Sequence, residues 1–264
     1  MRHTRRAITL VETITVFGII TLLLALAAGA ATKVGREARS GTCRSNLRQI
    51  ALATESYRNV NDGELPAAIL FFDEPGGGVR TVAWDFEQSS SGEVKPGPLW
   101  SYVDGGMEVH QCPEFKGPST FGSDPWTGYN YNTSFLGAEG QYPWTGQDGR
   151  RMQGWDAARP GLRSSSHHKP DRCAMFADGG WHGGANKFMR APGNTVEYDL
   201  GRVYAGGQAF RHGGCCNVVH LDGHCSGLCE PREGVHAQAW LLKDIMAFPR
   251  NGFLSDDDSL YDPR

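Results

Sequence analysis

The side chains most able to do chemistry in this sequence lie between residues 211 and 229. His212, His220, Asp222 and His224 stand there among four cysteines. Imidazole, carboxylate and thiolate groups are the usual protein ligands of zinc. This segment therefore raises the question of a metal site or of metal-dependent chemistry.

The spacing within the segment does not favour a metal site. Asp222-Gly223 is typical of a two-residue hairpin turn of type I′, in which both central residues have positive φ. Such a turn interrupts the alternation of side chains between His220 and His224, so their convergence does not follow from the sequence. We expect no metal and no cofactor here, with His212 and Asp222 fixing loops through hydrogen bonds.

The predicted turn also indicates how the cysteines pair, because neighbouring cysteines of exported proteins usually form disulfides. In the register of a two-residue turn, Cys216 faces Cys229, and facing strand residues are close enough to be bridged. We therefore predict a Cys216–Cys229 disulfide. A second candidate joins Cys43 to Cys112. Seven cysteines leave at least one unpaired.

The sequence lacks the common catalytic signatures. It contains no nucleophile elbow, no phosphate loop and no HExxH helix. We therefore expect no catalytic residues and a protein that is not an enzyme.

The part of the chain before Cys43 contains a long apolar segment. Residues 13–32 contain no charge and are long enough to cross a bilayer core of about 30 Å, and three arginines precede them within residues 1–6. The arginines should stay cytoplasmic, which places the rest outside. Residues 1–60 carry nine Lys and Arg against three Glu, so the remainder is acidic. An acidic body without a basic patch argues against nucleic acid as a partner.

A secretory signal peptide, a plain anchor and a processed anchor all fit an apolar segment. The apolar region of a signal peptide is shorter, about 7 to 15 residues. Glu12 lies at the start of the apolar run, where an unpaired carboxylate is costly and usually functional. Neither of the first two alternatives accounts for it.

The basic leader, residues 7–12 (AITLVE) and the apolar helix together resemble the prepilin-type cleavage and methylation signal of type IV pilins and type II secretion pseudopilins. The resemblance implies cleavage between Ala7 and Ile8 by an inner-membrane prepilin peptidase and methylation of the new terminus. It also implies that Glu12 meets the terminal amine of a neighbouring subunit. The family normally has Gly where this chain has Ala7, and often Phe where it has Ile8.

Three further patterns resemble a bacterial, planctomycete-type group that joins a pseudopilin stem to a larger head. They are His212 followed after nine residues by Asp222-Gly223, the run CRSNLRQ beginning at Cys43, and the Cys112-Pro step. The resemblance implies that other pilin-like subunits and the lipid bilayer are partners. The resemblance to type II secretion pseudopilins makes calcium the ion to test, with candidate oxygen ligands at Asp178, Asp199 and residues 256–258.

These observations predict an α+β fold, in which a pilin-like long N-terminal helix packs on an antiparallel β-rich head with long loops. Apolar or small residues recur at spacings of four and three at Cys43, Leu47, Ile50, Thr54 and Tyr57, which is one face of an amphipathic helix. We expect a leader over residues 1–7, a transmembrane half over 8–32, an amphipathic half over 33–61, a head over 64–254 and a solvated acidic tail over 255–264.

Short β-rich runs separated by turns predict the strands of the head. They cover residues 81–86, 99–103, 108–112, 129–133, 172–177 and 196–204, and a second helix is expected at about 236–248.

The functional expectation is a structural pseudopilin in the bacterial inner membrane. It would cross once, with its N-terminus cytoplasmic and its head extracytoplasmic, and assemble into a type II secretion or type IV pilus-like filament. The alternative is a head that binds a ligand or performs metal-dependent chemistry on the same anchor without polymerising.

Overall fold

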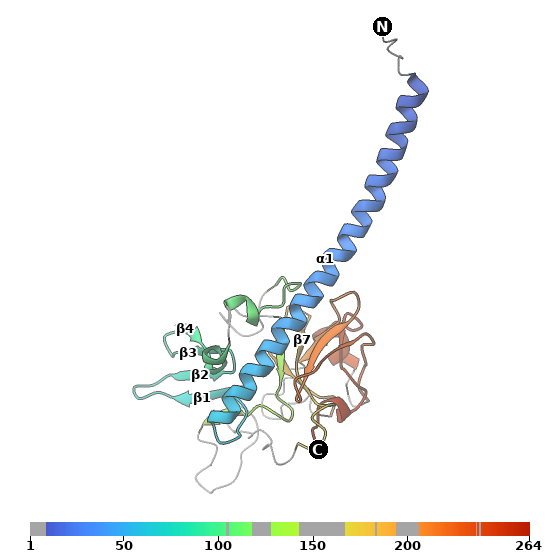
Figure 1. The fold of residues 1–264 in the computed structure, drawn as a ribbon. Coiled ribbons are helices and arrows are strands. Elements are labelled where there is room, and N and C mark those ends of the chain that lie inside the picture. The colour runs from blue at the N-terminus through green and yellow to red at the C-terminus, as the bar shows by residue number, and fades with distance from the viewer. Residues whose placement is uncertain are drawn as a thin grey trace.

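The computed structural model describes residues 9–103, 106–117, 128–142, 167–182, 184–193, 206–235, 237 and 239–264. These residues form one long helix, α1 (Leu10–Val60), followed by a head of short strands and helical turns. Figure 1 shows the N-terminal half of α1 projecting from the head and its C-terminal half lying across the head. The α+β, pilin-like architecture predicted from the sequence is confirmed.

Helix α1 has two halves with different surroundings. Its 51 residues span about 75 Å at a rise of about 1.5 Å per residue. All residues from Thr9 to Val34 are exposed, and this stretch is long and apolar enough to cross a membrane, with a mean hydropathy of 2.4 over its best window. Burial begins at Ser40, and the predicted face is confirmed, since Cys43 and Leu47 are fully buried.

The described strands form two sheets. The first has the order β4 (Val94–Pro96), β3 (Phe86–Gln88), β2 (Val79–Ala83), β1 (Ile69–Asp73), β6 (Glu139–Tyr142), antiparallel except between β1 and β6. The second has the order β11 (Cys225–Leu228), β10 (Cys216–His220), β7 (Ala174–Gly180), β5 (Tyr129–Asn132), β8 (Phe188–Met189). Its strands are antiparallel except β5 and β8, and β9 (Gly207–Ala209) links β7 to β12 (Asn251–Gly252).

The core lies where α1 covers β7 and β10. Leu47 and Ile50 of α1 pack in one buried cluster with Phe176 of β7. Trp84, which follows β2, extends this cluster toward the first sheet, with its ring centroid 5.0 Å from that of Phe176. The buried ion pair between Lys187 and Asp85 also joins the two sheets. The C-terminal half of α1 is therefore part of the core of the head.

Some predicted elements are wrong. Residues 99–103 and 108–112 coincide with the 3-10 helices η1 (Pro98–Tyr102) and η2 (Met107–His110), not with strands. Pro98 fixes φ in the first turn of η1 and has no N–H to give to a sheet. A helix does form within the range predicted at about 236–248, but it is the shorter π-helix η4 (Leu241–Met246), ended by Ala247 in the left-handed region. The predicted strand over 196–204 lies outside the described residues.

The last ten residues do not form a solvated tail. They include the 3-10 helix η5 (Asp258–Leu260), and Tyr261 is fully buried. The Tyr261 hydroxyl accepts a hydrogen bond from Leu254 N–H at 2.8 Å and donates one to Gln208 at 2.7 Å. One buried aromatic ring therefore docks a segment whose acidic composition predicted exposure.

Candidate functional site

The N-terminal residues predicted to matter for assembly are only partly described. Ala7 and Ile8 lie outside the described residues. Thr9 is the N-cap of α1, and its hydroxyl accepts a hydrogen bond from Glu12 N–H at 3.3 Å. The Glu12 carboxylate in turn accepts from Thr9 N–H at 2.8 Å. Glu12 thus completes a capping box that stabilises the first turn of the apolar helix.

The hairpin between β10 and β11 turns differently from the prediction. His220 N–H donates to the carbonyl of His224 at 2.9 Å, and Gly223 N–H donates to the carbonyl of His220 at 2.8 Å. Within this three-residue loop only Gly223 has positive φ, whereas a type I′ turn needs two such residues. The longer loop shifts the register by one, so that Cys216 faces Leu228.

The predicted Cys216–Cys229 disulfide is wrong for this reason. Cys229 bonds to Cys215 instead, and Cys216 is a buried free thiol. Successive side chains of a strand point to opposite faces, so a one-residue shift changes which cysteine meets Cys229. Cys43 and Cys112 are also free thiols, so the second predicted disulfide is absent.

The residues of the His212-x9-Asp222-Gly223 pattern do not meet. His212 precedes β10 and Asp222 follows it, so the two residues lie at opposite ends of this strand. Asp222 accepts hydrogen bonds from the backbone and the ring of His224, at 3.1 and 2.7 Å. Asp222 and Gly223 therefore shape the hairpin loop, whereas His212 belongs to a different place in the head.

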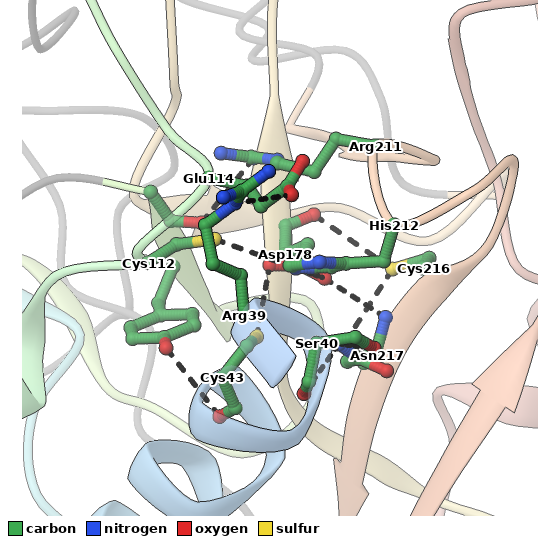
Figure 2. Close-up of polar contacts among 12 residues, drawn as sticks. Arg39, Ser40, Cys43, Cys112, Glu114, Asp178, Arg211, His212, Cys216 and Asn217 are labelled. Atoms are coloured by element: carbon green, nitrogen blue, oxygen red, sulfur yellow. Dashed lines mark hydrogen bonds and ion pairs between the residues drawn. The ribbon is translucent and has the colours of Figure 1, made fainter. Parts of the chain in front are cut away.

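His212 lies in a buried cluster with Cys43, Cys112 and Asp178. One candidate ligand atom from each of the four side chains lies within 4.8 Å of the others, and all four residues are buried. Cys43 Sγ is 3.4 Å from Asp178 Oδ1, Cys112 Sγ is 3.5 Å from His212 Nε2, and His212 Nε2 is 3.3 Å from Asp178 Oδ2. Figure 2 shows the four side chains converging from separate segments of the chain.

Each member of the cluster is placed by a different element. Cys43 lies on the buried face of α1, Asp178 lies in β7, and Cys112 follows η2. The Gly213-Gly214 turn positions His212, with φ values of 66° and 90° and paired hydrogen bonds between His212 and Cys215. This turn, and not Asp222-Gly223, has the two positive φ values of a type I′ turn.

Neighbouring residues hold the carboxylate of Asp178 in place and let the backbone at Gly128 lie close to Cys112. Asn217 N–H donates to Asp178 Oδ2 at 2.8 Å, and the Asn217 side chain donates to Ser40 Oγ at 3.3 Å (Figure 2). A Cβ at Gly128 would lie 2.7 Å from the Cβ of Cys112, and Gly128 has φ of 105°. A glycine is therefore required for this close approach.

The titration of the four groups is strongly perturbed. Burial raises the pKa of Cys43 far above its usual range. The hydrogen bond with Cys43 lowers the pKa of Cys112 to about 7. Burial alone would lower the pKa of His212, but its hydrogen bonds with Asp178 and Cys112 raise it to about 9. Burial alone would raise the pKa of Asp178, but contact with His212 lowers it. His212 and Asp178 therefore form a buried ion pair at neutral pH.

The sequence did not predict this convergence. Cys43, Cys112 and His212 belong to three different sequence patterns, and the sequence offers Asp178 only as a calcium ligand. The other calcium candidates do not join it, because this cluster is the one group with three or more such ligands among the described residues. Asp199 lies outside those residues. Cys43, Cys112 and His212 have one signal in common: each belongs to a pattern that resembles the planctomycete-type group.

No family model, curated protein or solved structure matches the chain.

Proposed function

We propose that this protein is a membrane-held, pilin-like structural subunit that assembles through its N-terminal helix. The observation that carries the proposal is the abrupt change along α1. Apolar side chains such as Leu10, Phe17 and Leu24 are 77%, 62% and 64% exposed, whereas the face from Ser40 onward is buried in the head. A continuous apolar surface of this length needs a bilayer or neighbouring stems to cover it.

Processing and topology follow from this proposal. A prepilin peptidase of the inner membrane would cut between Ala7 and Ile8, leaving residues 8–32 in the bilayer and the head extracytoplasmic. Partners would be lipid and other pilin-like subunits, in a type II secretion or type IV pilus-like filament. Nucleic acid is not among them, and the head has a structural and not an enzymatic role.

The competing function is a head that binds a ligand or performs metal-dependent chemistry on the same anchor without polymerising. The two functions share the anchor and differ in contacts between stems. A test of the proposal must therefore measure both processing and association.

The first measurement is mass spectrometry of the N-terminus of the full chain, produced with and without prepilin peptidase. We expect a start at Ile8 that depends on the peptidase. A start near Ala28 or Lys33 would instead indicate a secretory signal peptide.

The second measurement is oxidative crosslinking between stems that carry Leu22→Cys together with Leu26→Cys, two exposed positions one turn apart. A filament gives ladders of several subunits, and these should disappear in cells without the peptidase. Processed protein that remains monomeric at native expression would contradict assembly and favour the lone anchor.

A further inference from the structure

We infer that Cys43, Cys112, Asp178 and His212 form a structural zinc site that joins the stem to the head. The hairpin alone gave no reason to expect a metal, because the four ligands come from segments far apart in the sequence. Cys43 and Asp178 are 135 positions apart, and Cys112 and His212 are 100 apart. The fold brings together two thiols, one carboxylate and one imidazole, which are all zinc ligands.

The distances between the candidate ligand atoms fit a tetrahedron around zinc. With zinc about 2.3 Å from sulfur and about 2.0 to 2.2 Å from nitrogen and oxygen, tetrahedral geometry separates the ligand atoms by about 3.3 to 3.8 Å. Cys43 Sγ lies 3.4 Å from Asp178 Oδ1, Cys112 Sγ lies 3.5 Å from His212 Nε2, and His212 Nε2 lies 3.3 Å from the other carboxylate oxygen, Oδ2. With one ligand atom taken from each residue, all pairs lie within 4.8 Å, so the longest separation must shorten by up to about 1 Å to accept the ion.

Burial assigns the site a structural role. Cys43, Cys112 and Asp178 have no exposed surface, and the side chain of His212 is also fully buried. Four protein ligands fill the coordination of tetrahedral zinc and leave no open position for water or substrate. A nucleophilic role for Cys112 is disfavoured for the same reason, since no substrate can reach a thiol without exposed surface.

The surroundings suit the charge of a bound ion. Once His212 has lost its proton to bind as a neutral imidazole, two thiolates and a carboxylate leave the zinc complex with one net negative charge, and the positive charge of Arg211 interacts favourably with the charged forms of Cys112 and Asp178. Asn217 holds the carboxylate as an outer-shell donor. His212 and Ser40 also line a groove of about 420 Å³ beside α1, so the cluster borders this groove.

The test uses the full chain, purified in detergent under reducing conditions and loaded with zinc or cobalt(II). We expect about one metal ion per chain and, with cobalt, the intense visible absorption and thiolate charge-transfer band of a tetrahedral site. Cys112→Ser should weaken metal binding by at least about tenfold. The matched control is Cys225→Ser, which removes a half-buried free thiol outside the cluster and should leave binding unchanged.

A measurement on the parent chain keeps the test decisive if the Cys112 variant does not fold. Stoichiometric zinc should raise the melting temperature of the parent chain, and a chelator should reverse the rise, because an ion that binds only the folded state stabilises it. Failure to take up metal, a six-coordinate cobalt spectrum, or a Cys43–Cys112 disulfide in exported protein would each overturn the zinc site. None of these outcomes depends on polymerisation, so they do not bear on the proposed assembly.

Discussion

The thiol of Cys43 in the long helix lies 3.4 Å from the carboxylate of Asp178 in the central strand β7. Two further contacts near it tie the helix to the head. Arg39 forms an ion pair with Glu114 at 2.7 Å, and the Asn46 side chain donates hydrogen bonds to two backbone carbonyls, one in η2 and one directly after it. The C-terminal half of α1 and the head are therefore one folding unit.

Asn46 offers the simplest test of that unit. Its side-chain amide donates to the carbonyls of Glu108 at 3.1 Å and Gln111 at 3.2 Å. Asn46→Ala should lower the free energy of unfolding by about 1 to 3 kcal/mol, because two hydrogen bonds are lost in a largely buried place. Urea unfolding of the full chain in detergent measures this. Ser45→Ala, at an exposed position on the same helix, is the control, and equal midpoints for the two variants would contradict the role of Asn46.

The disulfide prediction concerns which cysteine pairs with Cys229. Non-reducing peptide mapping of exported protein should find Cys215 bonded to Cys229 and Cys216 as a free thiol. Cys229→Ser should destabilise the head by about 3 kcal/mol, the chain-entropy value for a loop of this length. Cys225→Ser should have a much smaller effect. A Cys216–Cys229 peptide would show that the hairpin has the two-residue register after all.

The stem was predictable because its signals are local. A charge-free run and a spacing of four and three fix the two halves of α1, including the burial of Leu47 and Ile50, without knowledge of the rest of the chain. The residues after Ser255 show the opposite case. Three consecutive aspartates predict exposure, but the contact of Tyr261 with Gln208, 53 positions away, decides the outcome.

The candidate site was not predictable for a related reason. Its four residues come together only because α1, β7, the loop after η2 and the Gly213-Gly214 turn pack in one place. The sequence correctly singled out Cys43, Cys112 and His212 as pattern residues. It could not reveal that Asp178 completes the group, since no periodicity links residues on separate elements.

His220, whose ring stacks on that of His224 in the hairpin with the centroids 4.2 Å apart, predicts a pH effect on stability. Burial and the neighbouring charge of His224 lower the pKa of His220 to about 4, from 6.5. Between these pH values the unfolded chain binds a proton that the folded chain does not, so stability falls as pH drops from about 6.5 to 4. The full shift corresponds to up to about 3 kcal/mol.

His220→Gln should reduce that slope by the share of His220, and the buried His110, whose pKa burial lowers to about 3, keeps a slope of the same sign. Thermal or urea unfolding at several pH values between 4 and 7 measures it, with His182→Gln, at an exposed position, as the control. The control should retain the slope of the parent. A parent curve that is flat over this range would contradict the neutral, buried state of His220.

The last prediction separates the two roles that Glu12 can have. In the capping box its carboxylate accepts hydrogen bonds from Thr9, and loss of a cap costs about 0.5 to 2 kcal/mol of helix stability. In the proposed filament the same carboxylate neutralises the amine freed at Ile8 on a neighbouring subunit. Removing one partner of such a desolvated pair costs several kcal/mol, because the remaining charge is left unpaired.

Two variants distinguish these roles. Glu12→Gln keeps the capping box, in which glutamine also serves, but cannot neutralise an amine. Thr9→Ala removes the capping hydroxyl and leaves the carboxylate. We therefore expect Glu12→Gln to be processed and inserted but to lose stem crosslinking, as Glu12→Ala should, while Thr9→Ala still gives ladders. If Glu12→Gln crosslinks as well as the parent and Thr9→Ala does not, Glu12 acts as a helix cap, and assembly does not depend on its charge.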